Sequence, residues 1–241
     1  MLAKVTIVIP FYNCNYVGQA VRSALKQSYP NKEVLVVDDG SDNRYFKELR
    51  PFLGEITYIQ KKNGGTASAL NLGIKKASGN YITWLSSDDL YAPEKVEKQV
   101  SFMQKHGALF SFSNYCLINE TNEVIARVVG PRYRTVIEFY RDFLKGNTIN
   151  GCTVMMHKQI FNDVGLFDEA LPFTHDYDLW LRIMLARHDL YYLDESLTMY
   201  RYHSEMGTRK YGDKIAKEIE ITRGKYQLRL SKLIDQIIGG E

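Results

Sequence analysis

The sequence predicts an α/β fold built on a doubly wound, mostly parallel sheet, and three observations support this class. Short runs of apolar, mainly β-branched residues recur through the first half of the chain. Helically spaced apolar residues separate the first two runs, and strand, helix and strand in this order imply a right-handed parallel crossover. Carboxylates follow two of the runs, at the end of a parallel sheet where ligands bind.

The first half of the chain is expected to alternate strands with helices. The predicted strands are residues 5–9, 34–37, 56–60 and 81–85. Runs that are apolar on both faces are typical of buried parallel strands. Apolar residues from Val17 to Leu25 keep the spacing of one helix face, and a second helix follows the polar loop 61–65, with Leu70, Ile74 and Ala77 facing inward.

From about residue 108 the pattern changes to that of a mixed α+β region. Short strands are expected at 109–113 and 124–129, and a helix is expected to begin near Asp176. The pair Asp194–Glu195 is interpreted as a solvated turn. The stretch 215–238 has helical spacing, with an apolar stripe formed by Ile219, Tyr226, Leu230, Leu233 and Ile237.

These patterns divide the chain into three parts. Residues 1–107 are expected to form an α/β half, residues 108–205 a second half of the same domain, and residues 206–241 an amphipathic helical tail. Residues 201–241 contain nine Lys or Arg and six Asp or Glu residues, whereas the first 200 residues contain 22 of each sign. Because no basic patch forms on the body, nucleic acid is not expected as a partner.

The chain has the composition of a globular protein. Its 241 residues are 45% hydrophobic and 24% charged, as is ordinary for a globular protein. No apolar run approaches the roughly 18 residues that would cross a bilayer. The N-terminus passes straight into a strand pattern, so the expected location is the cytoplasm. Cys14, Cys116 and Cys152 lack CxxC spacing and are expected to be reduced thiols.

Asp38-Asp-Gly-Ser41 is the first candidate motif, and it directly follows a predicted buried strand. A carboxylate on a tight glycine turn can accept hydrogen bonds from a base N–H or a ribose hydroxyl. Asp, Gly and Ser are also standard turn formers, so a purely structural turn explains the same residues. Both interpretations remain open from the motif alone.

Ser87-Asp88-Asp89 is the second candidate motif, at the end of another predicted strand. Adjacent carboxylates repel each other unless a cation or hydrogen bonds compensate. Mg²⁺ and Mn²⁺ accept such carboxylate oxygens together with substrate phosphate oxygens. The alternative is that Asp89 caps a helix that begins near Pro93 and Glu94.

Two further polar residues have simple structural explanations. Asp176 stands at the start of a predicted helix, where it could act as a cap or complement the helix dipole. His203 by itself is typical of a surface histidine. The chain lacks a P-loop, a GxGxxG motif after the first strand and a GxSxG elbow, which disfavours NTPases, dinucleotide oxidoreductases and hydrolases. The loop 11–15 lacks the Gly, Arg and Lys residues expected of a sugar nucleotidyltransferase.

Taken together, the motifs resemble family 2 glycosyltransferases with the GT-A fold, over residues 4 to about 205. The resemblance rests on the order and spacing of six stretches: Val8–Asn13, Val36–Ser41, Asn63–Gly73, Gly79–Ile82, Ser87–Asp89 and Asp176–Arg182. It implies an inverting transfer of a sugar from a nucleotide diphosphate donor, usually a UDP-sugar, to an acceptor hydroxyl, with Mn²⁺ or Mg²⁺ as the metal.

The resemblance also implies roles for individual residues. Asp39 would contact the base, Asp176 would be the catalytic base, and Asp89 would bind the metal. Asp88 would lie near the ribose, and His203 would help to hold the diphosphate or the metal. The remaining expected donor-binding residues are Pro10, Tyr12, Asp38 and Asn71.

The sequence departs from the family pattern at two positions. Ser86 stands where the family often has Asp, and Leu70 where it commonly has Arg. An alternative function is therefore a catalytically impaired nucleotide-sugar-binding or scaffolding module of a glycan-assembly complex. As a family member, the chain would act in polysaccharide biosynthesis on a glycan or a lipid-linked acceptor, and a lipid-linked acceptor would bring the basic C-terminal helix to a membrane surface.

Overall fold

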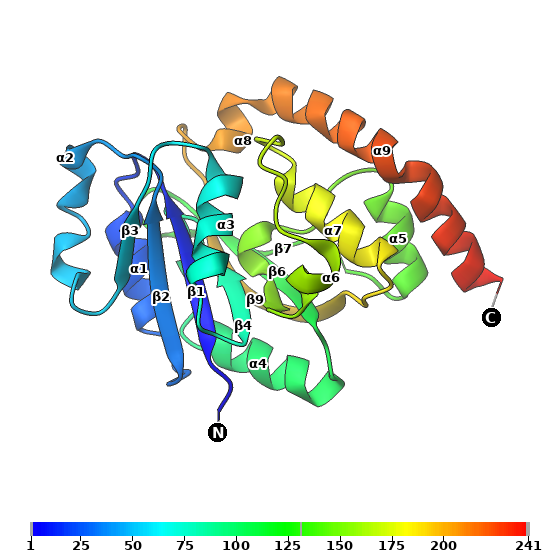
Figure 1. Ribbon diagram of the computed structural model, residues 1–241, viewed down its shortest axis with the longest axis horizontal. Coiled ribbons are helices and arrows are strands. Elements are labelled where there is room, and N and C mark those ends of the chain that lie inside the picture. The colour runs from blue at the N-terminus through cyan, green and yellow to red at the C-terminus, as the bar shows by residue number, and fades with distance from the viewer. Residues whose placement is uncertain (1, 131, 240–241) are drawn as a thin grey trace.

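The computed structural model describes residues 2–130 and 132–239. Its centre is one mixed sheet with the strand order β3-β2-β1-β4-β8-β6-β9-β5, and β7 pairs with β6. Helices cover the sheet, and the long helix α9 (Gly212–Ile238) runs along the edge of the molecule to the carboxyl end of the described chain (Figure 1). The predicted α/β class is confirmed.

The first half of the chain forms the parallel part of the sheet. Its strands are β1 (Val5–Phe11), β2 (Lys32–Asp38), β3 (Thr57–Gln60) and β4 (Tyr81–Trp84). Its helices are α1 (Val17–Leu25), the single turn α2 (Asn43–Phe46), a 3₁₀ turn at Arg50–Phe52 and α3 (Thr66–Lys76). Strand β1 is central, and it pairs in parallel with β2 on one side and β4 on the other.

Strand β1 is buried along its whole length because each face of the sheet meets a helix layer. Val5, Ile7 and Ile9 pack in one core cluster together with α1. Val8 points to the opposite face and packs in a second cluster together with α3. This arrangement explains why the sequence of β1 is an unbroken apolar run.

The second half of the chain extends the same sheet. Its strands are β5 (Leu90–Tyr91), β6 (Phe110–Ile118), β7 (Val124–Val129), β8 (Met155–His157) and β9 (Tyr191–Arg201). Its helices are α4 (Lys95–His106), α5 (Val136–Phe143), a 3₁₀ turn at Gly151–Thr153, α6 (Ile160–Val164), α7 (His175–Leu185) and α8 (Gly207–Lys210). Strand β8 runs antiparallel between β4 and β6 and joins the two halves.

The long parallel pair of β6 and β9 was not predicted, and it corrects one interpretation. Asp194 and Glu195 lie inside β9 and not in a turn. They fall where the pairing shifts, between Ser113 opposite Leu193 and Asn114 opposite Ser196. A bulge takes extra residues out of the ladder, so two acidic residues can occur within a strand.

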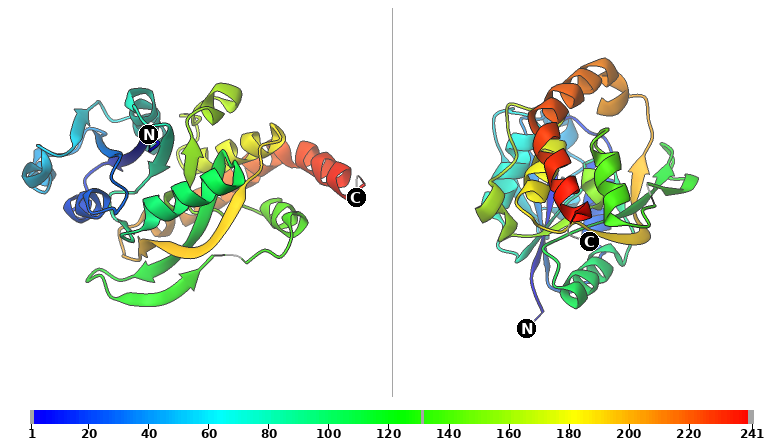
Figure 2. Two further views of the ribbon diagram at one scale, coloured as in Figure 1. Left: turned by 90° about the horizontal axis from the view of Figure 1, so that it is seen from below. Right: turned by 90° about the vertical axis from the view of Figure 1, so that its right-hand side faces the viewer.

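Helix α9 packs against the second half of the domain. Figure 2 shows it lying beside α5 and α7. Tyr226, Leu230 and Leu233 are buried and Ile219 and Ile237 are partly buried, which confirms the predicted stripe. In the part of the chain that the structure describes, no helix combines the length and the apolar character needed to cross a membrane.

Candidate active site

Two adjoining cavities open beyond the carboxyl ends of β1, β2 and β4. The strand-end cavity has a volume of about 580 Å³, and its walls include Pro10, Tyr12, Asp39 and Asp88. The α7 cavity has a volume of about 640 Å³, and its walls include Asp176. The residues that line both cavities and so form a shared wall are Trp84, Ser86, Phe173, Tyr200, Thr208 and Ile215.

Asp39 is held firmly at the wall of the strand-end cavity. Its carboxylate accepts hydrogen bonds from Lys61 Nζ at 2.6 Å, from the Gly64 amide at 2.9 Å and from the Gly65 amide at 2.7 Å. Gly65 has φ of 88°, a backbone conformation that favours glycine. The carboxylate is therefore fixed before any ligand binds, and a ligand N–H would use one of its remaining lone pairs. Lys61, a cation beside this cavity, was not predicted from the sequence.

Asp38 has a structural role in the turn. Its Oδ1 accepts the Ser41 amide at 2.7 Å, and its Oδ2 accepts the Tyr58 hydroxyl. The side chain is buried and lines neither of the two cavities. The structure thus favours the turn interpretation for Asp38, whereas its neighbour Asp39 reaches the cavity.

The two acidic residues after β4 differ sharply in their surroundings. Asp88 lines the strand-end cavity, and its Oδ2 lies 3.1 Å from Nε2 of His203. Asp89 is only 1% exposed, its Oδ1 accepts the Arg201 amide at 2.8 Å, and its Oδ2 has no partner among the described residues. Burial, and then the charge of Asp88, raise the pKa of Asp89 well above its usual range. Asp88 is therefore the carboxylate that faces the cavity, and the predicted metal contact of Asp89 is not placed there.

Two structural explanations suggested by the sequence are wrong: Asp89 is not a helix cap, and His203 is not a surface histidine. Helix α4 begins at Lys95, and Asp89 makes no capping bond to it. His203 is not a surface residue, because it is 9% exposed and its ring meets Tyr16 edge-on. A buried histidine beside a cavity carboxylate points to a role in the site.

Asp88 and His203 fit a divalent cation as a partial set of ligands. A carboxylate oxygen and an imidazole nitrogen are both accepted by Mn²⁺, and phosphate oxygens would supply further ligands. Among residues 2–130 and 132–239, no group of three or more His, Cys, Asp or Glu side chains is arranged around one metal position. A cation at this place would thus be shared between protein and substrate.

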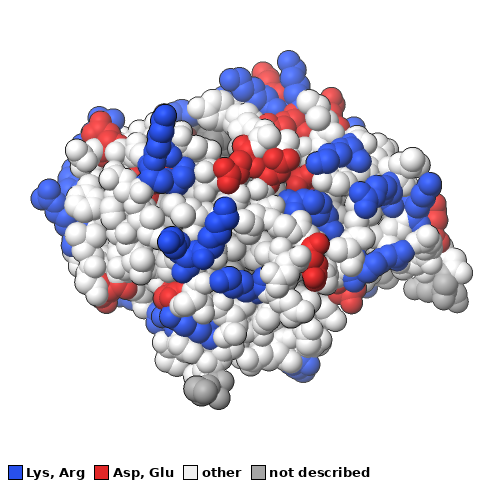
Figure 3. All heavy atoms as spheres, in the orientation of Figure 1, with Lys and Arg blue, Asp and Glu red and all other residues white. Residues whose placement is uncertain are grey.

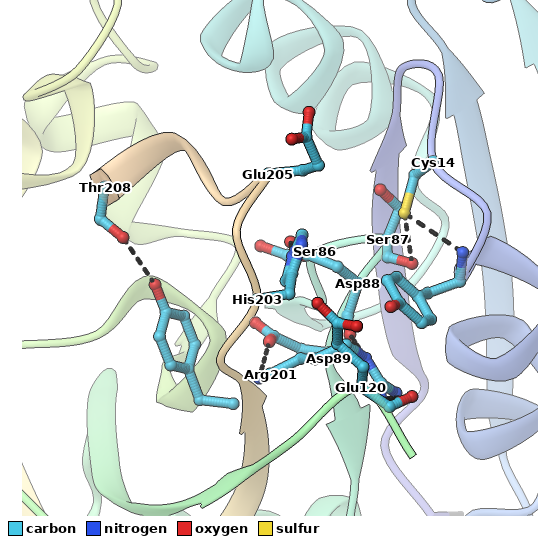
Figure 4. Close-up of polar contacts among 12 residues, drawn as sticks. Cys14, Ser86, Ser87, Asp88, Asp89, Glu120, Arg201, His203, Glu205 and Thr208 are labelled. Carbon is cyan, nitrogen blue, oxygen red and sulfur yellow. Dashed lines mark hydrogen bonds and ion pairs between the residues drawn. The ribbon is translucent and has the colours of Figure 1, made fainter. Parts of the chain in front are cut away.

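Arg201 organises this segment, and sequence reasoning missed it. Its side chain is fully buried at the end of β9. Arg201 lies beside Asp88 (Figure 4), and its Nε donates to the Asp88 carbonyl at 2.7 Å. Its Nη1 donates to the Asn119 carbonyl at 3.0 Å, and its guanidinium lies 4.2 Å from the centre of the Tyr16 ring. Its position two residues before His203 was the only signal in the sequence. Arg201 is a positioning residue, because its contacts hold the backbone of the acidic segment.

Two cysteine thiols contact the segment of Ser86, the residue that stands where the family often has Asp. The Ser86 amide and hydroxyl lie 3.3 and 3.0 Å from Sγ of Cys152, and Sγ of Cys14 lies 3.4 Å from the Ser87 carbonyl (Figure 4). Burial raises the pKa of Cys14 to about 11, so this thiol is neutral at physiological pH. All three cysteines are free, as predicted.

Asp176 lies in the first turn of α7, with its carboxylate in the α7 cavity. Its Oδ2 accepts from Asn147 Nδ2 at 3.0 Å and its Oδ1 from the Tyr177 amide at 2.7 Å. Burial raises the pKa of Asp176 despite these bonds. The N-cap of α7 is Thr174, so Asp176 is not the capping residue, although its charge complements the helix dipole.

The start of α7 is fixed from a distant part of the chain. Oε1 of Glu218, on α9, accepts the Phe173 amide at 2.9 Å, the Thr174 amide at 2.8 Å and the Thr174 hydroxyl at 2.9 Å. These bonds satisfy backbone donors that a helix N-terminus leaves free. The position of Asp176 therefore depends on α9.

Asn71 and Leu70 do not reach the cavities. Asn71 is buried, and its side chain bonds both the carbonyl of Phe167 at 2.9 Å and its amide at 3.0 Å. Leu70 packs in the core. The predicted donor contact of Asn71 is thus not brought to the site; its amide joins α3 to the loop before α7.

The chain belongs to glycosyltransferase family 2, because the family model described as glycosyl transferase family 2 matches residues 6–165. It is 36% identical over 185 residues to UDP-Glc:alpha-D-GlcNAc-diphosphoundecaprenol beta-1,3-glucosyltransferase WfgD of Escherichia coli, covering 75% of this chain and 69% of WfgD. It is also 41% identical over 215 residues to an uncharacterized glycosyltransferase of Rickettsia conorii. That match covers 86% of this chain but only 35% of the Rickettsia protein, so this chain corresponds to a part of that relative.

The fold is similar to that of S. aureus TarS. For residues 1–349 of TarS in complex with UDP-GlcNAc, the TM-score is 0.73 at 16% identity, and the match covers 96% of this chain and 71% of that one. The complex with UDP has a TM-score of 0.69. Together with the family membership, this likeness confirms the predicted GT-A fold.

Proposed function

We propose that this chain is an inverting glycosyltransferase that moves a sugar from a nucleotide diphosphate donor, a UDP-sugar, to a hydroxyl of a glycan or lipid-linked acceptor. One observation carries the proposal: Asp176 lines a cavity that shares a wall with the cavity lined by Asp39 and Asp88. In this proposal Asp176 is the base, and the neighbouring cavity binds the nucleotide. WfgD, a relative named for a UDP-Glc donor and a diphosphoundecaprenol-linked acceptor, supports these substrate classes.

The strand-end cavity is the proposed donor site. Pro10, Tyr12 and Asp39 would contact the nucleotide, and Asp88 and His203 would hold the diphosphate through Mn²⁺ or Mg²⁺. Such a cation stabilises the negative charge that develops on a departing diphosphate. In this proposal Asp88 takes the metal role expected of Asp89, because Asp89 is buried behind the cavity wall.

Asp176 is the proposed general base. Its carboxylate would accept the proton of the acceptor hydroxyl as that oxygen attacks the anomeric carbon. The raised pKa makes the carboxylate a better proton acceptor than an ordinary aspartate. Among the described residues that line the α7 cavity, Asp176 is the only carboxylate. A single base without a carboxylate nucleophile fits direct displacement, and hence inversion.

Calorimetric titration with UDP, with and without Mn²⁺, tests the donor site, and donor hydrolysis over a panel of nucleotide sugars tests catalysis. We expect UDP to bind more tightly with Mn²⁺, and one nucleotide sugar to be hydrolysed. Absence of UDP binding would contradict the proposal. Binding without turnover, with any acceptor offered, would instead favour the alternative of a catalytically impaired module.

A lipid-linked acceptor would require the protein to work at a membrane surface, and α9 is the proposed contact. Ile221 and Leu228 are 71% and 69% exposed, and they lie two helical turns apart. Lys217 and Lys232 lie one turn away from them on the same face. Figure 3 shows Lys and Arg side chains over α9 at the right-hand side. Exposed apolar residues flanked by lysines are typical of interfacial helices.

Flotation with vesicles that contain anionic lipid tests this contact. We expect the wild-type protein to float, and the double variant Ile221→Ser with Leu228→Ser to stay in the dense fraction. Leu53→Ser, at another exposed leucine, is the control. Equal flotation of wild type and double variant would exclude α9 as the contact. Point variants are preferable to removal of the helix, because α9 covers buried core residues.

A further inference from the structure

His175 is a buried side chain whose polar atoms nothing in the described structure uses. It is the first residue of α7, directly before Asp176, and it lines the strand-end cavity. Its side chain is only 6% exposed, and neither Nδ1 nor Nε2 has a hydrogen-bond partner among the described residues. Burying a polar group without a partner costs free energy, so such a group calls for an explanation.

The imidazole is held in place by aromatic packing. Its ring centroid lies 5.7 Å from that of Trp84 with an interplanar angle of 35°, and 5.6 Å from that of Phe167 with an angle of 73°. Trp84 lines both cavities, and its Nε1 is also buried without a partner among the described residues. Packing thus fixes the His175 ring at the strand-end cavity and the Trp84 ring at the shared wall, and the ring nitrogens of both lack partners among the described residues.

The other buried or half-buried histidines have hydrogen-bond or ion-pair partners among the described residues, which makes His175 distinct. The pairs are His203 with Asp88 at 3.1 Å, His188 with Asp163 at 3.0 Å, and His157 with the Gln159 amide at 3.3 Å. His106 is exposed on α4. Packing alone does not require an imidazole at position 175, because a phenylalanine ring would make the same aromatic contacts.

We infer that His175 hydrogen-bonds a hydroxyl of the donor sugar and thereby helps to determine which sugar is accepted. The inference rests on the proposed function, in which the strand-end cavity holds the diphosphate near Asp88. The sugar must then lie between Asp88 and Asp176, and His175 adjoins both the cavity of one and the helix turn of the other. The nitrogens of an imidazole can form hydrogen bonds with a hydroxyl group, which both donates and accepts.

A polar site of this kind predicts selectivity. A site that hydrogen-bonds a substrate hydroxyl rejects the analogue that lacks it, because its own polar groups then stay unpaired. We therefore expect the wild-type protein to discriminate against one monodeoxy analogue of its donor sugar. The same analogue should be accepted almost as well as the natural sugar once the imidazole nitrogens are removed.

The test compares His175→Phe and His175→Gln with the wild-type protein, and His106→Phe is the control at an exposed histidine. For His175→Phe we expect unchanged UDP affinity, a KM for the accepted UDP-sugar raised about 10- to 100-fold, and lost discrimination against one monodeoxy donor. His175→Gln should recover part of the affinity. Resistance to urea should not fall in His175→Phe, because removing a buried unpartnered polar group is neutral or stabilising.

The outcomes separate this inference from the proposed function. If the wild-type protein binds UDP-sugar and His175→Phe keeps the same KM and the same discrimination, the role of His175 is wrong and the proposed function stands. A loss of urea resistance together with UDP affinity would show a structural role. If His175→Phe does not fold, the deoxy-sugar panel with wild type and the smaller apolar variant His175→Leu decides, and equal discrimination by both overturns the inference. Failure of the wild-type protein to bind UDP would contradict both proposals.

Discussion

The strand-end cavity and the α7 cavity are built in different ways, although they share a wall. The carboxylates of the strand-end cavity, Asp39 and Asp88, belong to segments that follow strands, and residues between 172 and 215 complete its wall. The α7 cavity combines Asn147, Asp176 and the start of α9, which lie far apart in the chain. The carboxylates of one cavity therefore follow from local strand order, whereas the carboxylate of the other depends on long-range packing.

The two cavities also differ in how their carboxylates are held. Asp39 is compensated by Lys61 and two glycine amides, and the structure gives it strong local support. Among the described residues Asn147 is the only side-chain donor to Asp176, and burial raises the pKa of Asp176. A well-compensated carboxylate suits binding, and a poorly compensated one suits proton transfer. The two cavities should therefore respond differently to substitution.

The largest effect is expected for Asp176→Asn. Turnover should fall by about 10²- to 10⁴-fold, because the variant cannot accept the proton of the acceptor. UDP affinity should barely change, since Asp176 lies in the α7 cavity and not in the strand-end cavity. For Asp39→Asn we expect the reverse, namely weakened UDP binding with a smaller effect on turnover. Steady-state kinetics and calorimetry measure both quantities, and Asp235→Asn on the exposed face of α9 is the control. Unchanged turnover in Asp176→Asn would remove this residue from the mechanism.

The pH dependence of turnover tests the same residue. Asp176 must be deprotonated to act as a base, and burial raises its pKa above the ordinary value of 3.8. The value of kcat/KM should therefore fall as pH decreases through that raised pKa, at higher pH than for an exposed aspartate. This acid limb should be absent from the residual activity of Asp176→Asn. The same limb in both proteins would assign it to another group.

A smaller effect is expected when the long-range support of α7 is removed. Glu218→Ala leaves the amides of Phe173 and Thr174 without their acceptor, which should cost about 1–3 kcal/mol of stability. Turnover should fall, whereas UDP affinity should be retained. Urea denaturation and kinetics measure these effects, and Glu220→Ala, on the exposed face of the same helix, is the control. Equal loss of UDP affinity would mean that the two cavities are not independent.

The smallest effects are expected at two glycines, with opposite signs. A Cβ at Gly224, in the middle of α9, meets nothing within 4 Å. Gly224→Ala should therefore stabilise the protein by about 0.5–1 kcal/mol. Gly65→Ala should destabilise it by about 1–2 kcal/mol, because φ at that position lies in the left-handed region, and it should also weaken UDP binding. Thermal unfolding and calorimetry check both, and stability changes of the same sign would contradict the expected contrast between the two positions.

Much of the first half could be predicted from the sequence because its signals are local. Buried parallel strands are apolar runs, and the polar residues after β2 and β4 follow from the direction of those strands. The pairing of β6 with β9 could not be predicted, because its residues lie far apart and the bulge at Asp194 and Glu195 hides the strand pattern. The helix α5 was not predicted for a different reason, because its apolar face is short and consists mainly of aromatic residues.

Within the candidate site, the sequence predicted which segments matter better than which side chain does what. It indicated the pairs Asp38–Asp39 and Asp88–Asp89, but the spacing of adjacent residues does not show which one faces a cavity. In the tertiary structure Asp39 and Asp88 line the strand-end cavity, whereas Asp38 and Asp89 do not. Arg201 and His175 were not predicted, since nothing in their local sequence distinguishes a buried charge or an unpartnered imidazole.

The sequence by itself determined the class of fold, the family and the segments that carry carboxylates, because apolar periodicity and motif order are local properties of the chain. Only the tertiary structure decided that Asp39, Asp88 and Asp176 meet across one wall, and that Glu218 holds the helix that carries Asp176. The physical reason is that burial and hydrogen-bond partners depend on residues brought together from distant parts of the chain.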